Sequence, residues 1–274
     1  MISAVNSRDV DAYLERIGFV GPPAPTLPTL RQIQHRHVCT IPFENLDVHL
    51  GREIRLDLPS IWQKLVHEQR GGYCFEQNAL IQAVLIAPGF EVTPLIGRVR
   101  WQVPPDVQTA QTHMVLMVPC DGARYLMDGG FGSGSLTAPL PIDDEAEQLT
   151  PHEPRRVIQR NRVHVQQSRL GDNWADLYEF TLQPVQPVDY VVANWFTNTF
   201  PQSRFVLHLI AAIAGDGVRY TLLNREFATR WIDGRVEKRE LTTQAELLEV
   251  LATYFSLSFP ASTRFGAVGA PWPR

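Results

Sequence analysis

Apolar residues recur at helical spacing through the first ninety positions of this 274-residue chain. The first stripe follows Ser7, a residue type that caps helices, and consists of Val10, Tyr13, Leu14 and Ile17. The same spacing predicts further helices at residues 30–38, from residue 57 or 60 to the glycines at 71 and 72, and from Cys74 to residue 86. The N-terminal third of the chain is therefore predicted to be helical.

From residue 91 apolar positions alternate with polar ones, which is the period of a β-strand. Segments of this kind continue to about residue 182, with turn residues between them, and predict a small barrel or sandwich. Residues 183–190, which include two prolines, are predicted to be a connection. Beyond residue 200 the pattern predicts strands at 205–213, 218–224 and 226–232, and a helix at 244–254.

Composition narrows the classes of protein to which the chain could belong. The net charge is −4, so no general basic field is present to attract nucleic acid. No apolar run approaches the roughly 20 residues that span a bilayer, and the N-terminus lacks the pattern of a signal peptide. Three widely spaced cysteines, Cys39, Cys74 and Cys120, suit a reducing compartment better than a disulfide framework. We predict a cytoplasmic protein that binds neither nucleic acid nor membranes.

Cys74 stands where a helical pattern begins, in the segment RGGYCFEQN (residues 70–78). The positive end of a helix favours the thiolate form of a cysteine, so this is a suitable place for a nucleophile. The alternative is that Cys74 is a small buried apolar residue without a chemical role.

A His–Asp pair is predicted from the register of one hairpin. Asp121 and Gly122 form a strong two-residue turn signal between two apolar runs. With that turn, Asp128 lies opposite Val115, and His113 shares a face with Val115, so His113 and Asp128 become diagonal neighbours. Such a pair could orient a catalytic histidine, or it could be a satisfied core histidine beside a turn residue. Together with Cys74, the pair supplies a nucleophile, a base and an orienting carboxylate for acyl transfer.

Other patterns are weaker. The segment HRHVC holds His35, His37 and Cys39, but positions 35 and 37 point to different faces of a helix, which favours packing roles over a metal site. The glycine-rich residues 129–134 fit neither dinucleotide nor P-loop spacing, and we expect them to let the backbone approach a ligand. The chain contains no Gly-x-Ser-x-Gly elbow, which argues against a serine hydrolase of the α/β type. We predict no metal site.

Five segments resemble the motifs of the arylamine N-acetyltransferase family, in that family's order. They are IPFENLDVHLG (41–51), RGGYCFEQN (70–78), THMVLMV (112–118), DGGFG (128–132) and NWFTNTFPQSRF (194–205). The resemblance implies an α+β fold of three domains around a papain- or transglutaminase-like Cys-His-Asp core. A helical bundle at residues 1–90 would carry the nucleophile, a β-barrel at 91–200 the histidine and aspartate, and residues 201–274 would form an α/β lid.

The resemblance also implies the chemistry. Cys74 would be the nucleophile, His113 the base and Asp128 the orienter of a ping-pong reaction through an acetyl-Cys74 thioester. Acetyl-CoA would be the acyl-donor co-substrate, with no permanently bound cofactor. The acceptors would be small aromatic amines or hydrazines and N-hydroxyarylamines, and the protein could form a homodimer.

Further site residues follow from the resemblance and from their proximity to the motifs. The residues expected to contact the aromatic acceptor are Phe43, Phe131, Phe205 and Tyr73, each of which could instead be a core aromatic residue. The residues expected to contact CoA are Gly130, Gly132, Ser133 and Arg230, although Arg230 could equally belong to a solvated face. Arg70 is expected to pair with Glu44 beneath the nucleophile, unless the two form an exposed ion pair worth under about 1 kcal/mol.

Two rival functions remain open from the sequence. The first is a cysteine amidase or protease of the transglutaminase-like group, which would pass its acyl group to water or lysine. The second is a catalytically silent protein that binds CoA or an aryl ligand and in which Cys74 is merely packed.

Overall fold

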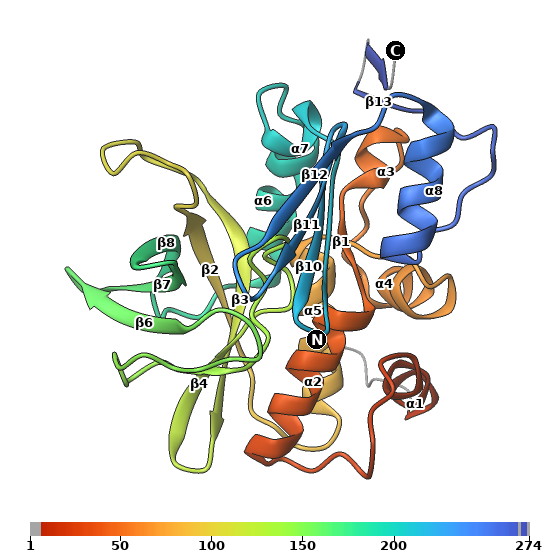
Figure 1. The fold of residues 1–274 in the computed structure, drawn as a ribbon. Coiled ribbons are helices and arrows are strands. Elements are labelled where there is room, and N and C mark those ends of the chain that lie inside the picture. The colour runs from red at the N-terminus through yellow and green to blue at the C-terminus, as the bar shows by residue number, and fades with distance from the viewer. Residues whose placement is uncertain (1–6, 268–269, 273–274) are drawn as a thin grey trace.

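The structure is a computed structural model that describes residues 7–267 and 270–272. Figure 1 shows N-terminal helices in red and orange, a curled sheet in yellow and green, and a second sheet in blue beside the C-terminal helix. No helix among the described residues is long and apolar enough to cross a membrane. The α+β class predicted from the sequence is confirmed.

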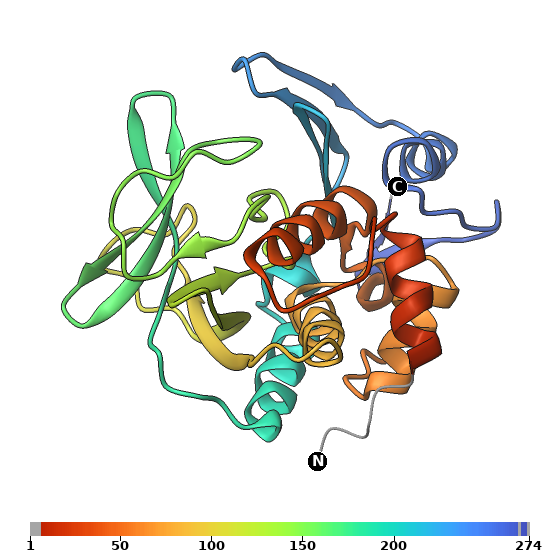
Figure 2. The same ribbon diagram turned by 90° about the horizontal axis from the view of Figure 1, so that it is seen from below.

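The four predicted N-terminal helices are present. The helical elements of this region are α1 (Ser7–Arg16), α2 (Leu27–Thr40), the single turn α3 (Leu46–His49), α4 (Leu58–Trp62) with a π-helical continuation (Gln63–His67), and α5 (Cys74–Ile86). Asp57 caps α4 by accepting a hydrogen bond from the N–H of Ser60 at 3.0 Å. Helix α5 is buried along most of its length and packs against strand β3 of the curled sheet, as Figure 2 shows from below.

The curled sheet has seven strands in the order β5-β4-β3-β2-β8-β7-β6, and its edges β5 and β6 lie against each other, which nearly closes a barrel. The strands are β2 (Thr93–Val99), β3 (Gln111–Cys120), β4 (Ala123–Met127), β5 (Leu140–Pro141), β6 (Arg155–Arg160), β7 (Val163–Leu170) and β8 (Asn173–Phe180). Asp121 and Gly122 have φ of 50° and 79°, as a primed two-residue turn requires, and Cys120 pairs with Ala123. The predicted hairpin register is confirmed.

The second sheet joins a strand of the N-terminal third of the chain to four strands of the C-terminal third. Its order is β1-β9-β10-β11-β12, with β1 (Phe43–Glu44), β9 (Ile210–Gly215), β10 (Val218–Leu223), β11 (Glu226–Trp231) and β12 (Val236–Glu240). Because β1 pairs with β9, the IPFEN segment is fixed by residues from beyond position 200. Helix α8 (Gln244–Phe255) packs on this sheet, and β13 (Phe265–Ala267) pairs with β14 (Ala270–Trp272). Strand β12 was not predicted because all five of its side chains are exposed and show no alternation.

Two predictions for residues 183–213 are wrong. The supposed connection contains the start of helix α6 (Pro187–Thr199), because Pro187 occupies the first turn, where its missing N–H costs no hydrogen bond. The supposed strand 205–213 begins with the short helix α7 (Arg204–Leu207), and only its later part is strand β9. Ser203 starts α7 by accepting a hydrogen bond from the N–H of Phe205 at 3.2 Å.

Candidate active site

Cys74 is the first residue of α5, as the sequence predicted. The N–H groups of Glu76 and Gln77 both donate to the Tyr73 carbonyl at 3.0 Å, so the amides of Cys74 and Phe75 precede the intrahelical bonds. The Cys74 side chain is 3% exposed, and its thiol donates to the Thr112 carbonyl at 3.5 Å. The thiol therefore lies at the positive end of a helix and is shielded from bulk water.

The two glycines before this helix are required by close packing rather than by flexibility. Neither has a left-handed φ. A Cβ on Gly71 would lie 2.1 Å from the Pro42 carbonyl oxygen, and a Cβ on Gly72 would lie 2.6 Å from the Glu76 carboxylate. Gly71 and Gly72 therefore belong to a tightly packed loop.

His113 and Asp128 form the pair that the hairpin register predicted. His113 Nε2 lies 2.8 Å from Asp128 Oδ2, and both side chains are buried. Burial would lower the pKa of His113, but the Asp128 carboxylate and a hydrogen bond with Cys74 raise it from 6.5 to about 10. Since Nε2 is engaged by Asp128, Nδ1 is the ring nitrogen available to the thiol. The structure thus brings Cys74, His113 and Asp128 together.

The Asp128 carboxylate is completely buried and has several hydrogen-bond donors. Its Oδ1 accepts from Asn78 Nδ2 at 3.0 Å and from the Gly130 N–H at 2.9 Å. Burial would raise the pKa of Asp128, but His113 and these donors hold it below its usual value. Gln34 from α2 binds both the N–H and the carbonyl of Asp128, at 3.0 and 2.9 Å. The sequence analysis did not predict the roles of Asn78 and Gln34. The position of Asn78, one helical turn after Cys74 and so on the same face of the helix, was the available signal for it.

A second buried histidine, His37, supports the site, and the sequence analysis did not predict this role. His37 binds the Tyr13 hydroxyl through Nδ1, at 2.9 Å, and the Gln77 side-chain oxygen through Nε2. Gln77 in turn donates to the carbonyls of Pro42 and Gly72, at 2.9 and 3.0 Å. Burial lowers the pKa of His37 to about 4, so at neutral pH it is an uncharged link in this chain of hydrogen bonds. His37 therefore holds the loop behind Cys74.

Arg70 and Glu44 belong to a buried network of charges. Arg70 Nη2 lies 2.6 Å from Glu44 Oε1 and 3.2 Å from Asp47 Oδ1. Lys64 lies 2.8 Å from Asp47 and 2.7 Å from Glu76. The alternative of an exposed ion pair is wrong, because the Arg70 and Glu44 side chains are both buried. The network joins the IPFEN segment to the loop that leads into α5.

The predicted aromatic residues lie in two places. Phe43 and Phe205 are edge to face at 5.8 Å, and the ring of Tyr73 lies 5.2 Å from that of Phe205. Phe131 does not belong to this group of three rings, and its own ring lies 5.2 Å from that of His113. Tyr73 is completely buried and its hydroxyl binds Asn194, so it is a structural residue behind the site and not an open ligand contact.

The residues predicted to contact CoA also lie in different surroundings. Gly130 packs directly on the nucleophile, since a Cβ there would lie 2.5 Å from Cys74 Cα. Gly132 has φ of 83° and packs on the Phe43 ring. Ser133 and Arg230 line a cleft of about 490 Å³ between the barrel and the second sheet, and Phe131 connects this cleft to His113.

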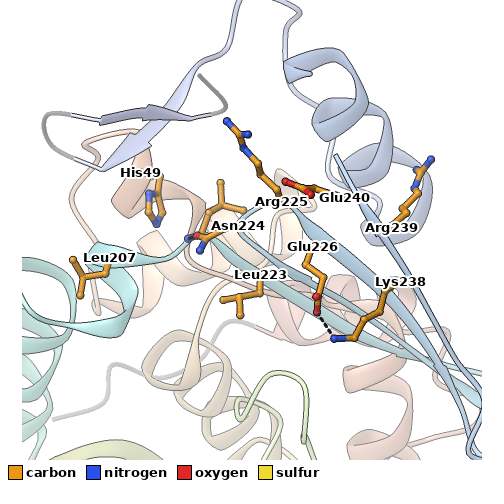
Figure 3. Close-up of a pocket in the computed structure, with 10 residues that line it drawn as sticks. His49, Leu207, Leu223, Asn224, Arg225, Glu226, Lys238, Arg239 and Glu240 are labelled. Carbon is orange, nitrogen blue, oxygen red and sulfur yellow. Dashed lines mark hydrogen bonds and ion pairs between the residues drawn. The ribbon is translucent and has the colours of Figure 1, made fainter. Parts of the chain in front are cut away.

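A second cavity, of about 550 Å³, lies at the end of the second sheet where β10 turns into β11. Figure 3 shows His49, Asn224 and the ion pair between Lys238 and Glu226 around it. Lys238 and Glu226 also line the cleft, so the two hollows adjoin. None of the three triad residues lines either hollow, but Phe131, whose ring lies beside that of His113, lines the cleft, so the cleft is the hollow relevant to the chemistry.

Comparisons with known proteins agree with this geometry. A family model described as N-acetyltransferase matches residues 26–264. The arylamine N-acetyltransferase of Escherichia coli (strain K12) is 41% identical over 247 residues, which cover 89% of this chain and 87% of the relative. The arylamine N-acetyltransferase / N-hydroxyarylamine O-acetyltransferase of Salmonella typhimurium is 38% identical, with 90% and 88% covered. The chain belongs to the arylamine N-acetyltransferase family.

A solved structure supports the same assignment. The Mycobacterium marinum arylamine N-acetyltransferase in complex with CoA superimposes with a TM-score of 0.87 at 40% identity, and the match covers 90% of this chain and 92% of that one. The resemblance drawn from five motifs is confirmed. Membership of the arylamine N-acetyltransferase family does not favour the reading as a cysteine amidase or protease.

Replacing Arg70 by Met tests the buried charge network of this N-acetyltransferase. The variant leaves Glu44 buried without its cation, and we expect a loss of about 3–5 kcal/mol in the free energy of unfolding, measured by denaturant titration. Arg124→Met is the matched control, since Arg124 and Asp143 form an exposed pair and the loss should stay below about 1 kcal/mol. Equal losses in both variants would contradict the structural role given to Arg70.

Replacing Asp128 by Asn tests the charge state of His113. A histidine whose pKa rises from 6.5 to about 10 on folding contributes stability that is complete below pH 6.5 and disappears as the pH rises through 10. The stability difference between wild type and Asp128→Asn should therefore shrink steadily between pH 6.5 and 10 in denaturant titrations. A difference that stays constant over this range would show that His113 is not held as an imidazolium.

Proposed function

We propose that this chain transfers the acetyl group of acetyl-CoA to arylamines and arylhydrazines, and to the oxygen of N-hydroxyarylamines, by way of a Cys74 thioester. The observation that carries the proposal is the 2.8 Å pair of His113 and Asp128 beside the thiol at the start of α5. The names of the relatives supply the donor and acceptor classes.

In the first half-reaction the Cys74 thiolate, paired with the His113 imidazolium, attacks the carbonyl carbon of acetyl-CoA. The first-turn amides of α5 are placed to stabilise the negative oxygen that forms. The carbon–sulfur bond to CoA then breaks, and the departing sulfur takes the proton from His113. Acetyl-Cys74 and free CoA result. Asp128 stabilises the imidazolium and fixes the orientation of its ring.

In the second half-reaction the amine nitrogen attacks the carbonyl carbon of acetyl-Cys74. His113 removes a proton from that nitrogen, and the thioester bond breaks to release the acetylated amine and the Cys74 thiolate. An amine must compete with water at this step, and the burial of Cys74 disfavours water. We propose that Phe43, Phe131 and Phe205 contact the flat acceptor, because the Phe131 ring lies beside that of His113, Phe43 packs on Gly132 of the same loop, and Phe205 packs on Phe43.

The phosphates of CoA need cations, and the cleft supplies them in spite of the negative total charge. Arg204, Arg230 and Lys238 line it, together with Ser133 and Phe131. We propose that the pantetheine arm runs from this cleft past Phe131 to Cys74. Gly130 then acts by its close packing on Cys74 and not by contact with CoA.

We also retain three predictions on which this proposal does not depend. They are the division into domains at residues 1–90, 91–200 and 201–274, a cytoplasmic location, and a homodimer. The location rests on the three cysteines, all of which are unpaired.

Intact-mass spectrometry tests the covalent intermediate. After acetyl-CoA is added without an acceptor, the wild type should gain the mass of one acetyl group, and Cys74→Ser should gain none while keeping its fold. Cys39→Ser is the matched control and should acetylate like the wild type, because the Cys39 thiol is hydrogen-bonded with His35 and not with a triad residue. An unmodified wild-type protein would instead support a silent binding protein.

Initial-rate kinetics test the order of events. If the acetyl group resides on Cys74 before the acceptor reacts, double-reciprocal plots at several acceptor concentrations should be parallel. Intersecting lines would indicate that both substrates are bound at once and would contradict the two half-reactions.

A further inference from the structure

The cleft between the barrel and the second sheet carries more positive charge than its own carboxylates balance. Five basic side chains line the cleft, but only two carboxylates do so, those of Glu153 and Glu226. Glu226 is paired with Lys238, whose ammonium lies 2.8 Å from it. The excess of positive charge therefore lies elsewhere in the cleft, on its arginines.

Three of these arginines form what we call the arginine cluster, namely Arg155 of β6, Arg219 of β10 and Arg230 of β11. Arg219 Nε and Arg155 Nη2 share the Glu153 carboxylate, at 2.8 and 3.1 Å. Arg230 lies directly opposite Arg219 in the register of β10 and β11, and both line the cleft. Like charges directly opposite each other destabilise a sheet. The cluster thus places three guanidinium groups beside one carboxylate.

Two members of the cluster have donors without a partner in the protein. Arg155 Nη1 is buried and has no hydrogen-bond partner among the described residues. The Arg230 side chain is exposed and forms no ion pair or hydrogen bond with them. Burial and the charge of Arg219 lower the pKa of Arg155 to about 10, although Glu153 opposes this shift. Because a buried cation is costly without an anion, the arrangement suits an anionic ligand.

We propose that the arginine cluster is a phosphate subsite, and that it recognises a phosphate of the CoA donor. This inference rests on the function proposed above, in which CoA is the substrate that carries phosphate. Three cations and one carboxylate leave the cluster with two positive charges. A phosphate monoester carries close to two negative charges at neutral pH, whereas a carboxylate would leave one cation unbalanced. The fork of N–H groups on arginine also matches the oxygens of a phosphate.

The members of the cluster have different parts in this subsite. Arg230 is exposed and contacts the phosphate directly, while Arg155 and Arg219 are buried and attract it from the wall of the cleft. Arg219 also donates to the Ser135 carbonyl at 3.1 Å, which fixes the cluster to the loop that carries Phe131. The phosphates of CoA take no part in the bond changes at the thioester. The subsite therefore strengthens donor binding and raises kcat/KM for the donor without raising kcat.

Rates of Cys74 acetylation with three donors test the proposal. The donors are acetyl-CoA, acetyl-dephospho-CoA, which lacks the 3′-phosphate, and S-acetylpantetheine, which lacks every phosphate. We expect Arg230→Met to lower kcat/KM for acetyl-CoA by roughly tenfold to a hundredfold, as for the loss of a hydrogen bond between charged groups. Arg230→Lys should lower it by less, because the charge remains. Arg31→Met is the matched control, since Arg31 is an exposed arginine of α2 that lines neither hollow.

The pattern among the donors identifies the phosphate that is bound. A loss in Arg230→Met that is confined to acetyl-CoA identifies the 3′-phosphate, and an equal loss with acetyl-dephospho-CoA identifies the diphosphate. An equal loss with S-acetylpantetheine would show that Arg230 does not act through a phosphate and would overturn the proposal. The same result would follow from equal rates in Arg230→Met and Arg31→Met.

Binding of adenosine 3′,5′-bisphosphate, measured by titration calorimetry, separates this inference from the proposed function because it requires no acetyl transfer. The wild type should bind this probe roughly tenfold or more tightly than Arg230→Met does, and Arg31→Met should bind it like the wild type. Equal affinities in the wild type and Arg230→Met would overturn the subsite. A wild type that binds the probe in this way but is acetylated by none of the donors would contradict the proposed function and leave the phosphate subsite supported.

Discussion

A completely buried carboxylate, that of Asp128, sets the constraint around which the catalytic centre is built. A buried charge is stable only when it is paired and hydrogen-bonded, and here the partners come from separate parts of the chain. His113 reaches it from β3 and Asn78 from α5, while Gln34 of α2 holds its backbone. The hydrogen bonds to Asp128 therefore hold the β3–β4 hairpin of the barrel against helices α2 and α5. This packing places His113 beside Cys74.

A second charged network fixes the other side of the nucleophile. Arg70, Glu44 and Asp47 are buried together, and Lys64 extends the network to Glu76 in the first turn of α5. These contacts connect the IPFEN segment, the loop before α5 and the helix itself. Because β1 within IPFEN also pairs with β9, the second sheet is tied to the same loop. The thiol is therefore held from the helical side and from the C-terminal side at once.

The glycines of the site follow from these constraints. Gly71 and Gly130 lie where backbone from another segment approaches too closely for a Cβ, and at Gly72 the Glu76 side chain leaves no room for one. Gly71 and Gly72 allow the loop before Cys74 to pack against Pro42 and Glu76. Gly130 allows the turn after Asp128 to pack directly on Cys74. Tight packing, and not freedom of movement, explains why glycine stands at these positions.

The sequence by itself determined the features that depend on near neighbours. The start of α5 at Cys74 and the turn at Asp121 and Gly122 follow from local rules, and the turn places His113 near Asp128 by register alone. From the sequence, Cys74 could be combined with that pair only by chemical type, and the tertiary structure decided that the three lie together, because no local rule relates a helix start to a strand 38 residues later. Helix α6 escaped prediction because Pro184, before it, and Pro187, at its first position, are typical of a connection, and because several of its large apolar residues face outward. The roles of Gln34 and His37, and the burial of Arg70, were decided by the tertiary structure, since hydrogen bonds and desolvation depend on which distant segments pack together.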